Sequence, residues 1–313
     1  MTTAFVFPGQ GSQAVGMGRG LAEAFGAARL VLEEVDEALQ QRLSRLMFEG
    51  PEAELTLTEN AQPALMAVSM AALRVLESEG GWKLSQKALF VAGHSLGEYS
   101  ALAAAGALRL ADAARLLKRR GRAMQRAVPV GEGAMAALLG LDLAAASEVA
   151  AAAAEDEVCA CANDNAPGQV VVSGALAAVE RAVKLAAEKG ARRSLMLPVS
   201  APFHCALMAP AAREMEEALG AVDLAPPVVP LVANVTAAPV SDPETIRRLL
   251  VDQVTGLVRW RECVLRLKAE GISRLVELGA GKVLSGLARR IDKDLEAAAV
   301  GQPADVEVVL KAL

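Results

Sequence analysis

The feature that most constrains the fold is the stretch 88–102, where a short apolar run leads into Gly-His-Ser-Leu-Gly and then into an alanine-rich run. The apolar run predicts a buried strand, and the alanine-rich run predicts a helix. Ser95 then occupies the tight turn between them, and the flanking Gly93 and Gly97 avoid side-chain clashes there. Free N–H groups at the helix start would face an oxyanion formed beside the serine. The pattern predicts a nucleophilic Ser95; the alternative is a structural turn whose serine caps the helix.

Length and composition set the class of protein. The 313 residues predict about two domains, or one large α/β unit with an insertion. Hydrophobic residues make up 53% of the chain and aromatic residues only 3%, so the core must consist of Leu, Val, Ala and Met. No apolar run reaches the ~18 residues of a membrane span, and the N-terminus shows no signal peptide. We therefore expect a cytoplasmic protein that binds no membrane.

Charge, cysteines and histidines narrow the functions further. The formal net charge of −5 gives no reason to expect nucleic acid. The cysteines form no C-x-x-C pair and no disulfide framework, so we expect buried, reduced thiols. They are Cys159, Cys161, Cys205 and Cys263. The two histidines, His94 and His204, are too few for a histidine-rich metal site, and any imidazole base must be one of them.

Two glycine-rich runs resemble nucleotide-binding loops. A predicted strand at Thr3–Phe7 precedes a run that matches G-x-G-x-x-A at 9–14, as in dinucleotide sites. Such a site needs a second strand that ends in an acidic residue about 20 positions later, whereas Leu30–Leu43 has helical spacing. A loop that brings its backbone and Gln10 close to a reacting centre is the favoured interpretation. Gly279–Lys282 lacks the full phosphate-loop spacing, so we interpret it as a strand-to-helix turn.

Two segments flank the Ser95 turn in the chain. We expect Leu57–Pro63 to form a loop into a helix over 64–79, and Leu110–Arg126 to form a helix after the turn. The second helix contains the basic run Lys118–Arg122. A solvated cationic face explains most of this run, but neighbours on a helix point in different directions, so one of them can point inward.

The segment from Gly133 to Leu197 has a different pattern of predicted strands and helices. Its pattern predicts strand, helix, strand, strand, helix and strand, which is the ferredoxin-like order. Pro129 and Pro198 bracket it. We therefore predict an α/β fold: an α/β-hydrolase-like catalytic domain with a parallel sheet (1–128 and 199–313) and an inserted ferredoxin-like domain (129–198).

The second part of the large domain opens with a proline-containing loop that carries His204. This is a natural place for the base that Ser95 needs; the alternative is a hydrogen-bonded structural histidine. Cys205 could be a nucleophile beside His204, but adjacent side chains seldom face each other, and Ser95 has the better turn. After this loop we predict a strand at Val228–Val232, two helices at Pro243–Val254 and Leu257–Ala269, and a further strand at Leu275–Leu278.

Several motifs together resemble one family. Their places in the chain are Phe7–Gln13, Gly93–Tyr99, Arg120-Gly121, Asn165–Gln169, Phe203–Cys205 and Glu277–Gly279. In this order they resemble the malonyl-CoA:acyl carrier protein transacylases and the acyltransferase domains of polyketide and fatty acid synthases. The resemblance spans nearly the whole chain and includes the inserted domain.

The resemblance implies a role for each matching residue. Ser95 would carry the acyl group, and His204 would be its base. The backbone carbonyl of Gln253 would orient the histidine, which gives a dyad without the carboxylate of hydrolases. The backbone N–H groups of Gln10 and Leu96 would form the oxyanion hole.

The resemblance also implies how the acyl group is recognised. Arg120 would bind the free malonyl carboxylate, because a planar guanidinium meets a carboxylate through two parallel hydrogen bonds. Asn165 is a further candidate for substrate contact. Leu96 and Phe203 occupy positions where the synthase domains carry methylmalonyl-selecting residues, so these side chains favour malonyl.

The implied reaction is ping-pong transfer of malonyl from malonyl-CoA, through a Ser95 ester, to the pantetheine thiol of acyl carrier protein. It needs no metal or redox cofactor, and we expect a monomer. Two other classes stay open. A serine hydrolase or thioesterase would share Ser95 and His204 but should offer an acid partner for the histidine. A non-catalytic carrier-binding subunit would not need an intact dyad.

Overall fold

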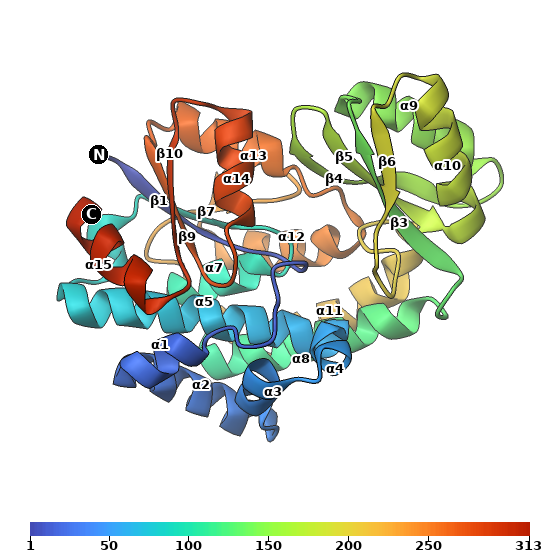
Figure 1. Cartoon of the computed structure of the whole chain (residues 1–313). Helices are drawn as coiled ribbons and strands as arrows, with labels where there is room; N and C mark the ends of the chain where they lie inside the picture. The colour runs from blue at the N-terminus through green and yellow to red at the C-terminus, as the bar shows by residue number, and fades with distance from the viewer.

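The computed structural model describes all residues, 1–313, and its strands form two separate sheets (Figure 1). The larger sheet has six strands in the order β10-β9-β1-β2-β7-β8. Its strands are β1 Thr3–Phe7, β2 Phe90–Gly93, β7 Leu231–Ala233, β8 Ala238–Val240, β9 Arg274–Leu278 and β10 Glu296–Val300. All neighbours are parallel except β7 and β8. The predicted α/β class is confirmed.

Both faces of the larger sheet are buried, as parallel sheets require. On β1, Phe5 and Phe7 belong to one hydrophobic core, whereas Ala4 and Val6 belong to another. The first core also contains residues of helices α5 (Thr58–Gly80) and α8 (Leu110–Ala127), which lie below the sheet in Figure 1. Helices α13 (Trp260–Ala269) and α14 (Val283–Ile291) cover the opposite face.

The remaining helices complete these layers. Before the Ser95 turn they are α1 Arg19–Ala24, α2 Gly26–Leu39, α3 Leu43–Glu49, α4 Glu52–Thr56 and α6 Leu84–Lys87. After it they are α7 Gly97–Ala104, α9 Leu143–Ala154, α10 Leu176–Glu188, the 3₁₀ turn η1 Ala206–Met208, α11 Ala209–Gly220, α12 Pro243–Thr255 and α15 Pro303–Ala312. No helix combines the length and apolar character needed to cross a membrane.

The smaller sheet contains β3 Gly133–Leu139, β4 Cys159–Ala166, β5 Gln169–Ala175 and β6 Arg193–Met196. Its order is β4-β5-β3-β6 and every pairing is antiparallel, which is the ferredoxin-like arrangement. Alternate residues of β3 point to opposite faces of the smaller sheet and belong to different hydrophobic cores. Ala136 and Leu138 pack in the core of α9 and α10, whereas Met135 and Ala137 belong to the core of the larger unit. The predicted boundaries of the inserted domain, 129 and 198, stay a prediction.

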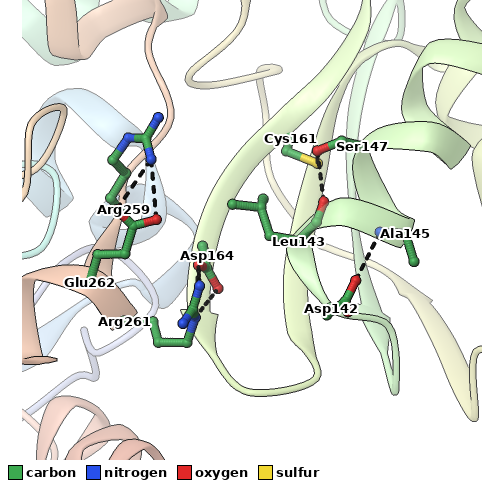
Figure 2. Close-up of polar contacts among 9 residues, drawn as sticks. All are labelled: Asp142, Leu143, Ala145, Ser147, Cys161, Asp164, Arg259, Arg261 and Glu262. Atoms are coloured by element: carbon green, nitrogen blue, oxygen red, sulfur yellow. Dashed lines mark hydrogen bonds and ion pairs between the residues drawn. The ribbon is translucent and has the colours of Figure 1, made fainter.

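Strand β4 ties the smaller sheet to the segment before α13. The N–H of Asp164 donates to the Val258 carbonyl at 2.9 Å, and the Val258 N–H donates to the Ala162 carbonyl at 2.9 Å. The buried carboxylate of Asp164 also pairs with Arg261 of α13: Nη2 lies 2.8 Å from Oδ2, and Nε lies 3.2 Å from Oδ1 (Figure 2). The two units are therefore joined by a bidentate ion pair and a short parallel bridge.

One local expectation is wrong. Leu57–Pro63 is not a loop, because α5 begins at Thr58 and contains Pro63. Proline lacks the N–H that would bond to the carbonyl four residues earlier, which usually ends a helix. Here α8 packs directly on this turn: a Cβ at Gly121 would lie only 2.5 Å from Glu59 Cα. Tertiary packing therefore keeps the turn helical.

The topology brings three loops to one edge of the larger sheet. Strands β1, β2 and β7 run parallel, so their carboxyl ends meet at the same edge. Gln10 follows β1, Ser95 follows β2 and Asn234 follows β7. The crevice outside the carboxyl ends of parallel strands is where α/β sheets bind ligands.

Candidate active site

The Ser95 turn has the strained geometry that the sequence predicts. Strand β2 ends at Gly93, helix α7 begins at Gly97, and Ser95 between them has a φ of 54°. A Cβ at Gly93 would lie 1.9 Å from the carbonyl carbon of Gly97, and one at Gly97 would lie 2.3 Å from the Phe7 carbonyl oxygen. Only glycine fits at either position, because the backbones of β1, β2 and α7 converge there. The turn exposes the serine above the sheet edge.

His204 lies between the serine and a backbone carbonyl. Its Nε2 is 2.8 Å from Ser95 Oγ, and its Nδ1 is 2.8 Å from the Gln253 carbonyl oxygen. A carbonyl only accepts, so Nδ1 carries the hydrogen and Nε2 presents its lone pair to the serine hydroxyl. Burial, and then the charge of Arg120, lowers the pKa of His204 to about 3. The imidazole is therefore neutral near pH 7 and can accept the serine proton.

Arg120 of α8 is a buried cation beside the nucleophile. Only 1% of the residue is exposed, and burial lowers its pKa. Nη1 donates to Gln62 Oε1 at 2.8 Å, and Nη2 donates to Gln253 Oε1 at 2.8 Å and to Ser95 Oγ at 3.1 Å. The guanidinium also lies 5.8 Å from the centre of the Tyr99 ring. All its direct partners are uncharged, so the group can still receive an anion.

The other cations of the basic run are already paired. Arg119 pairs with Glu214 at 3.1 Å, and Arg122 pairs with Glu59 at 2.7 Å. Lys118 is not solvated as a cationic face would require: it is 9% exposed and lies 3.0 Å from Glu59. Of this run, only Arg120 turns toward Ser95.

A cavity of about 480 Å³ opens onto these groups. Ser95, His204 and Arg120 line it, and so does Met135 from the smaller sheet, so its walls come from both units. Its other apolar lining residues are Leu96, Met124, Leu197, Pro198, Val199 and Phe203. A substrate would therefore meet the nucleophile, the base and the cation in one partly apolar pocket.

The two predicted oxyanion donors also line the cavity. Neither the Gln10 nor the Leu96 backbone N–H donates a hydrogen bond within the protein. Leu96 immediately precedes α7, where N–H groups lack helical partners. The Gln10 side chain is held by Thr58, whose hydroxyl donates to Oε1 at 2.6 Å. Two free N–H groups next to a serine can stabilise a developing oxyanion.

The structure places Asn165 away from the cavity lining. Its Oδ1 lies 2.8 Å from His94 Nε2, and Asn163 of the same strand lines the cavity instead. Burial lowers the pKa of His94, and its ring packs 5.7 Å from that of Trp260. His94 itself lines the cavity and is hydrogen-bonded to Asn165, and the substrate contact of Asn165 stays a prediction.

Three polar residues of the site had no role in the sequence prediction. Gln62 bonds to Arg120, Asn234 Oδ1 accepts the Ser95 N–H at 2.8 Å, and Glu98 Oε1 accepts the Asn234 N–H at 2.6 Å. Burial raises the pKa of Glu98 to about 8, against these hydrogen bonds and the charge of Arg120. Only Asn234 had a usable signal, since it lies two residues after the predicted strand Val228–Val232.

A strained serine, a neutral histidine at hydrogen-bond distance and two free N–H groups define a serine acyl-transfer site. Comparison with known proteins agrees: residues 4–301 match the acyl transferase domain family. The malonyl CoA-acyl carrier protein transacylase of Bacillus subtilis strain 168 is 46% identical over 99% of this chain and 96% of its own. The chain therefore belongs to the acyl transferase domain family, and within it to the malonyl-CoA:acyl carrier protein transacylases.

Solved structures show the same relationship. The acyl-carrier-protein S-malonyltransferase of Bartonella henselae is 58% identical, with a TM-score of 0.97 over 100% of this chain and 99% of its own. A type II PKS acyl-carrier protein has been solved in complex with its malonyl-transacylase. That structure matches at 42% identity and a TM-score of 0.96, over 100% of both chains.

Proposed function

We propose that this chain transfers the malonyl group of malonyl-CoA to the pantetheine thiol of an acyl carrier protein, through a malonyl ester on Ser95. The observation that supports this most directly is the surroundings of Ser95 Oγ. His204 Nε2 lies 2.8 Å from this oxygen and Arg120 Nη2 lies 3.1 Å from it, and Ser95 lines the cavity. The product would supply malonyl units for fatty acid or polyketide synthesis.

The first half-reaction loads the enzyme. Ser95 Oγ attacks the thioester carbonyl carbon while His204 Nε2 takes the hydroxyl proton. The N–H groups of Gln10 and Leu96 stabilise the tetrahedral oxyanion. The C–S bond then breaks, His204 returns the proton to the sulfur, and coenzyme A leaves as the thiol. The Gln253 carbonyl supports the imidazolium that forms between these steps, as the acid residue of a triad does.

The second half-reaction repeats these steps with a new nucleophile. The pantetheine thiol gives its proton to His204, and its sulfur attacks the ester carbonyl. The bond to Ser95 breaks, the serine oxygen recovers the proton, and malonyl leaves on the carrier. Because coenzyme A leaves before the carrier thiol reacts with the malonyl ester on Ser95, ping-pong kinetics follow.

Arg120 distinguishes malonyl from acetyl in this scheme. The two acyl groups differ by one carboxylate, and Arg120 is a buried cation without a carboxylate partner in salt-bridge range. A guanidinium can hold a carboxylate through two parallel hydrogen bonds. Leu96 and Phe203 line the same cavity and limit the space for a branched acyl group.

The carrier would dock on exposed cations. The family resemblance implies an acidic acyl carrier protein as the partner. Arg119 and Arg122 already pair with glutamates of this chain. Arg192 and Arg193 are exposed and unpaired, and the chain after them reaches the cavity lining at Leu197. We therefore place carrier docking near the start of β6. The monomeric state and cytoplasmic location stay predictions.

A hydrolase or thioesterase is the competing function, since it would share Ser95 and His204. Here the histidine bonds to a carbonyl and not to a carboxylate, and a cation adjoins the serine. Both features favour transfer of an anionic acyl group.

Intact-mass spectrometry after mixing with malonyl-CoA tests the function. We expect a malonyl adduct on the enzyme that disappears when carrier protein is added and reappears on the carrier. Ser95→Ala should form no adduct, and His204→Ala should slow acylation about 10²–10⁴-fold. Release of free malonate without carrier loading would identify a hydrolase, and a stable adduct on Ser95→Ala would contradict the assignment.

A further inference from the structure

Glu98 is a buried carboxyl group to which the reaction above assigns no role. It is the second residue of α7, is 1% exposed and does not line the cavity, so it cannot touch the substrate. Each of its oxygens accepts one N–H donor. Oε1 accepts the backbone N–H of Asn234 at 2.6 Å, and Oε2 accepts a short hydrogen bond from Gln253 Nε2.

The Gln253 side chain connects Glu98 with Arg120. Its Nε2 group donates both to Glu98 and to the Ser95 carbonyl at 2.9 Å, while its Oε1 accepts from Arg120 Nη2 at 2.8 Å. A guanidinium has only donors, so the amide must present its oxygen to Arg120 and its NH₂ group to Glu98. The reversed amide would place donors against donors and acceptors against acceptors.

We propose that Glu98 is a positioning residue for malonyl recognition: it fixes the Gln253 amide, and that amide holds the Arg120 guanidinium in place for the substrate carboxylate. This inference rests on the proposed role of Arg120. The other restraints on the guanidinium are Gln62 Oε1 at 2.8 Å and Ser95 Oγ at 3.1 Å. Without Glu98 the Gln253 NH₂ group keeps the Ser95 carbonyl as an acceptor but loses its carboxylate acceptor. The amide is then held less firmly, and its contact with Arg120 weakens.

The ratio of kcat/KM for malonyl-CoA to kcat/KM for acetyl-CoA reads out this role. Loss of folded protein lowers both values equally and leaves the ratio unchanged, whereas a displaced Arg120 lowers only the malonyl value. Glu98→Met removes both acceptor oxygens at similar size and should lower the ratio about tenfold or more, the scale of a hydrogen bond to a charged group. Glu98→Gln keeps one acceptor oxygen and should restore the ratio in part.

A double-mutant cycle tests the path through Gln253. Gln253→Ala keeps the backbone carbonyl for His204 and removes the amide, so it should lower the ratio as Glu98→Met does. If Glu98 acts through that amide, Glu98→Met combined with Gln253→Ala should lower the ratio no further than Gln253→Ala alone. Should Glu98→Met fail to fold, Gln253→Ala still decides whether the amide positions Arg120.

Glu277 provides a matched control. It is also a fully buried glutamate that accepts two backbone N–H groups, from Leu284 at 3.1 Å and Ser285 at 2.7 Å, but it holds the start of α14. Glu277→Met should leave the malonyl-to-acetyl ratio unchanged. An unchanged ratio in Glu98→Met or Gln253→Ala, or effects that multiply in the double variant, would overturn the proposal. If Arg120→Ala lowers the ratio but Glu98→Met and Gln253→Ala do not, only the inference about Glu98 fails. If Arg120→Ala also leaves the ratio unchanged, the proposed role of Arg120 in malonyl recognition fails.

Discussion

At the residue scale, the environment of Arg120 is unusual for a cation. Burial of an ionised side chain is costly unless opposite charge or several hydrogen bonds compensate. Arg120 receives three uncharged acceptors, and its buried Nε has no partner at all. An incoming carboxylate would supply the missing charge and further acceptors. This environment fits the proposed role of Arg120 in binding an anionic acyl group.

Arg120→Ala should change specificity more than it changes folding. Loss of one partner of a buried charge pair typically costs about 2–5 kcal/mol, which is roughly 30- to 4,000-fold. Malonyl transfer should fall by about that factor, while acetyl transfer should hold or rise because no charge is left unpaired. Lysine should rescue only in part, since it offers no planar fork. The measurement is kcat/KM for both thioesters, with Arg119→Ala, a half-exposed neighbour, as control; an unchanged ratio would make Arg120 a structural cation.

His204 should keep the acylation rate level into the acid range. An unperturbed histidine gains a proton near pH 6.5 and then cannot act as a base. Because the pKa of His204 is lowered to about 3, the neutral form persists below pH 6.5. Burial raises the pKa of Glu98 to about 8, so the window for this test begins below that pH. We expect kcat/KM for malonyl-CoA to stay level from about pH 7 to about pH 5. Circular dichroism at each pH would confirm folding, and an acid limb centred near 6.5 would refute this expectation.

At the element scale, the crossing of α5 and α8 sets the position of the cation. Gly121, directly after Arg120, lies against the first turn of α5, where a Cβ would come within 2.6 Å of the Thr58 carbonyl oxygen. The same turn holds Thr58 and Gln62, which bond to Gln10 and Arg120 respectively. The close approach of α5 and α8 therefore positions both the Gln10 loop and the Arg120 guanidinium.

Gly121→Ala should separate these helices. The added methyl group meets backbone atoms that cannot rotate away, and overpacking of this kind typically costs about 1–3 kcal/mol. We expect a lower free energy of unfolding in urea and a lower kcat/KM for malonyl-CoA. Gly286→Ala in α14 is the matched control, because no atom lies within 4 Å of its Cβ position. Equal stability of the two variants would show that the α5–α8 contact tolerates a side chain.

At the scale of the whole molecule, the cavity depends on both units. The loops after β1 and β2 supply Gln10 and Ser95, and β3 of the smaller sheet supplies Met135. The Asp164–Arg261 ion pair and the Val258 bridge hold the smaller sheet in this place (Figure 2). The exposed Arg192 and Arg193 belong to the smaller unit, so a docked carrier would contact the wall of the cavity.

Loss of the unpaired cations at β6 should weaken carrier docking. Charges at the rim of an interface mainly change the association rate and its dependence on salt. Arg192→Ser with Arg193→Ser should lower kcat/KM for the carrier several-fold at low salt and should flatten its salt dependence. Arg29→Ser with Lys293→Ser removes two other exposed cations and serves as control. If both double variants show the wild-type salt dependence, the carrier docks elsewhere.

The sequence by itself determined the local parts of this protein. Strand β2, the Ser95 turn and α7 follow from short-range patterns, because glycines and a tight turn constrain the backbone within a few residues. The order of strands and helices likewise predicted the ferredoxin-like unit. The short list of histidines and the loop at 199–205 predicted His204, and family motifs then predicted Arg120 and Gln253.

Only the tertiary structure decided how these parts meet. Ser95 and His204 lie 109 positions apart in the chain, and Arg120 and Gln253 lie 133 apart. No local periodicity encodes such pairs, because they arise when parallel strands and helices pack around one sheet. The link from Glu98 through Gln253 to Arg120 is of the same kind. A buried glutamate in a helix looks like any exposed one in sequence, and its role appears only when its hydrogen-bond partners are seen.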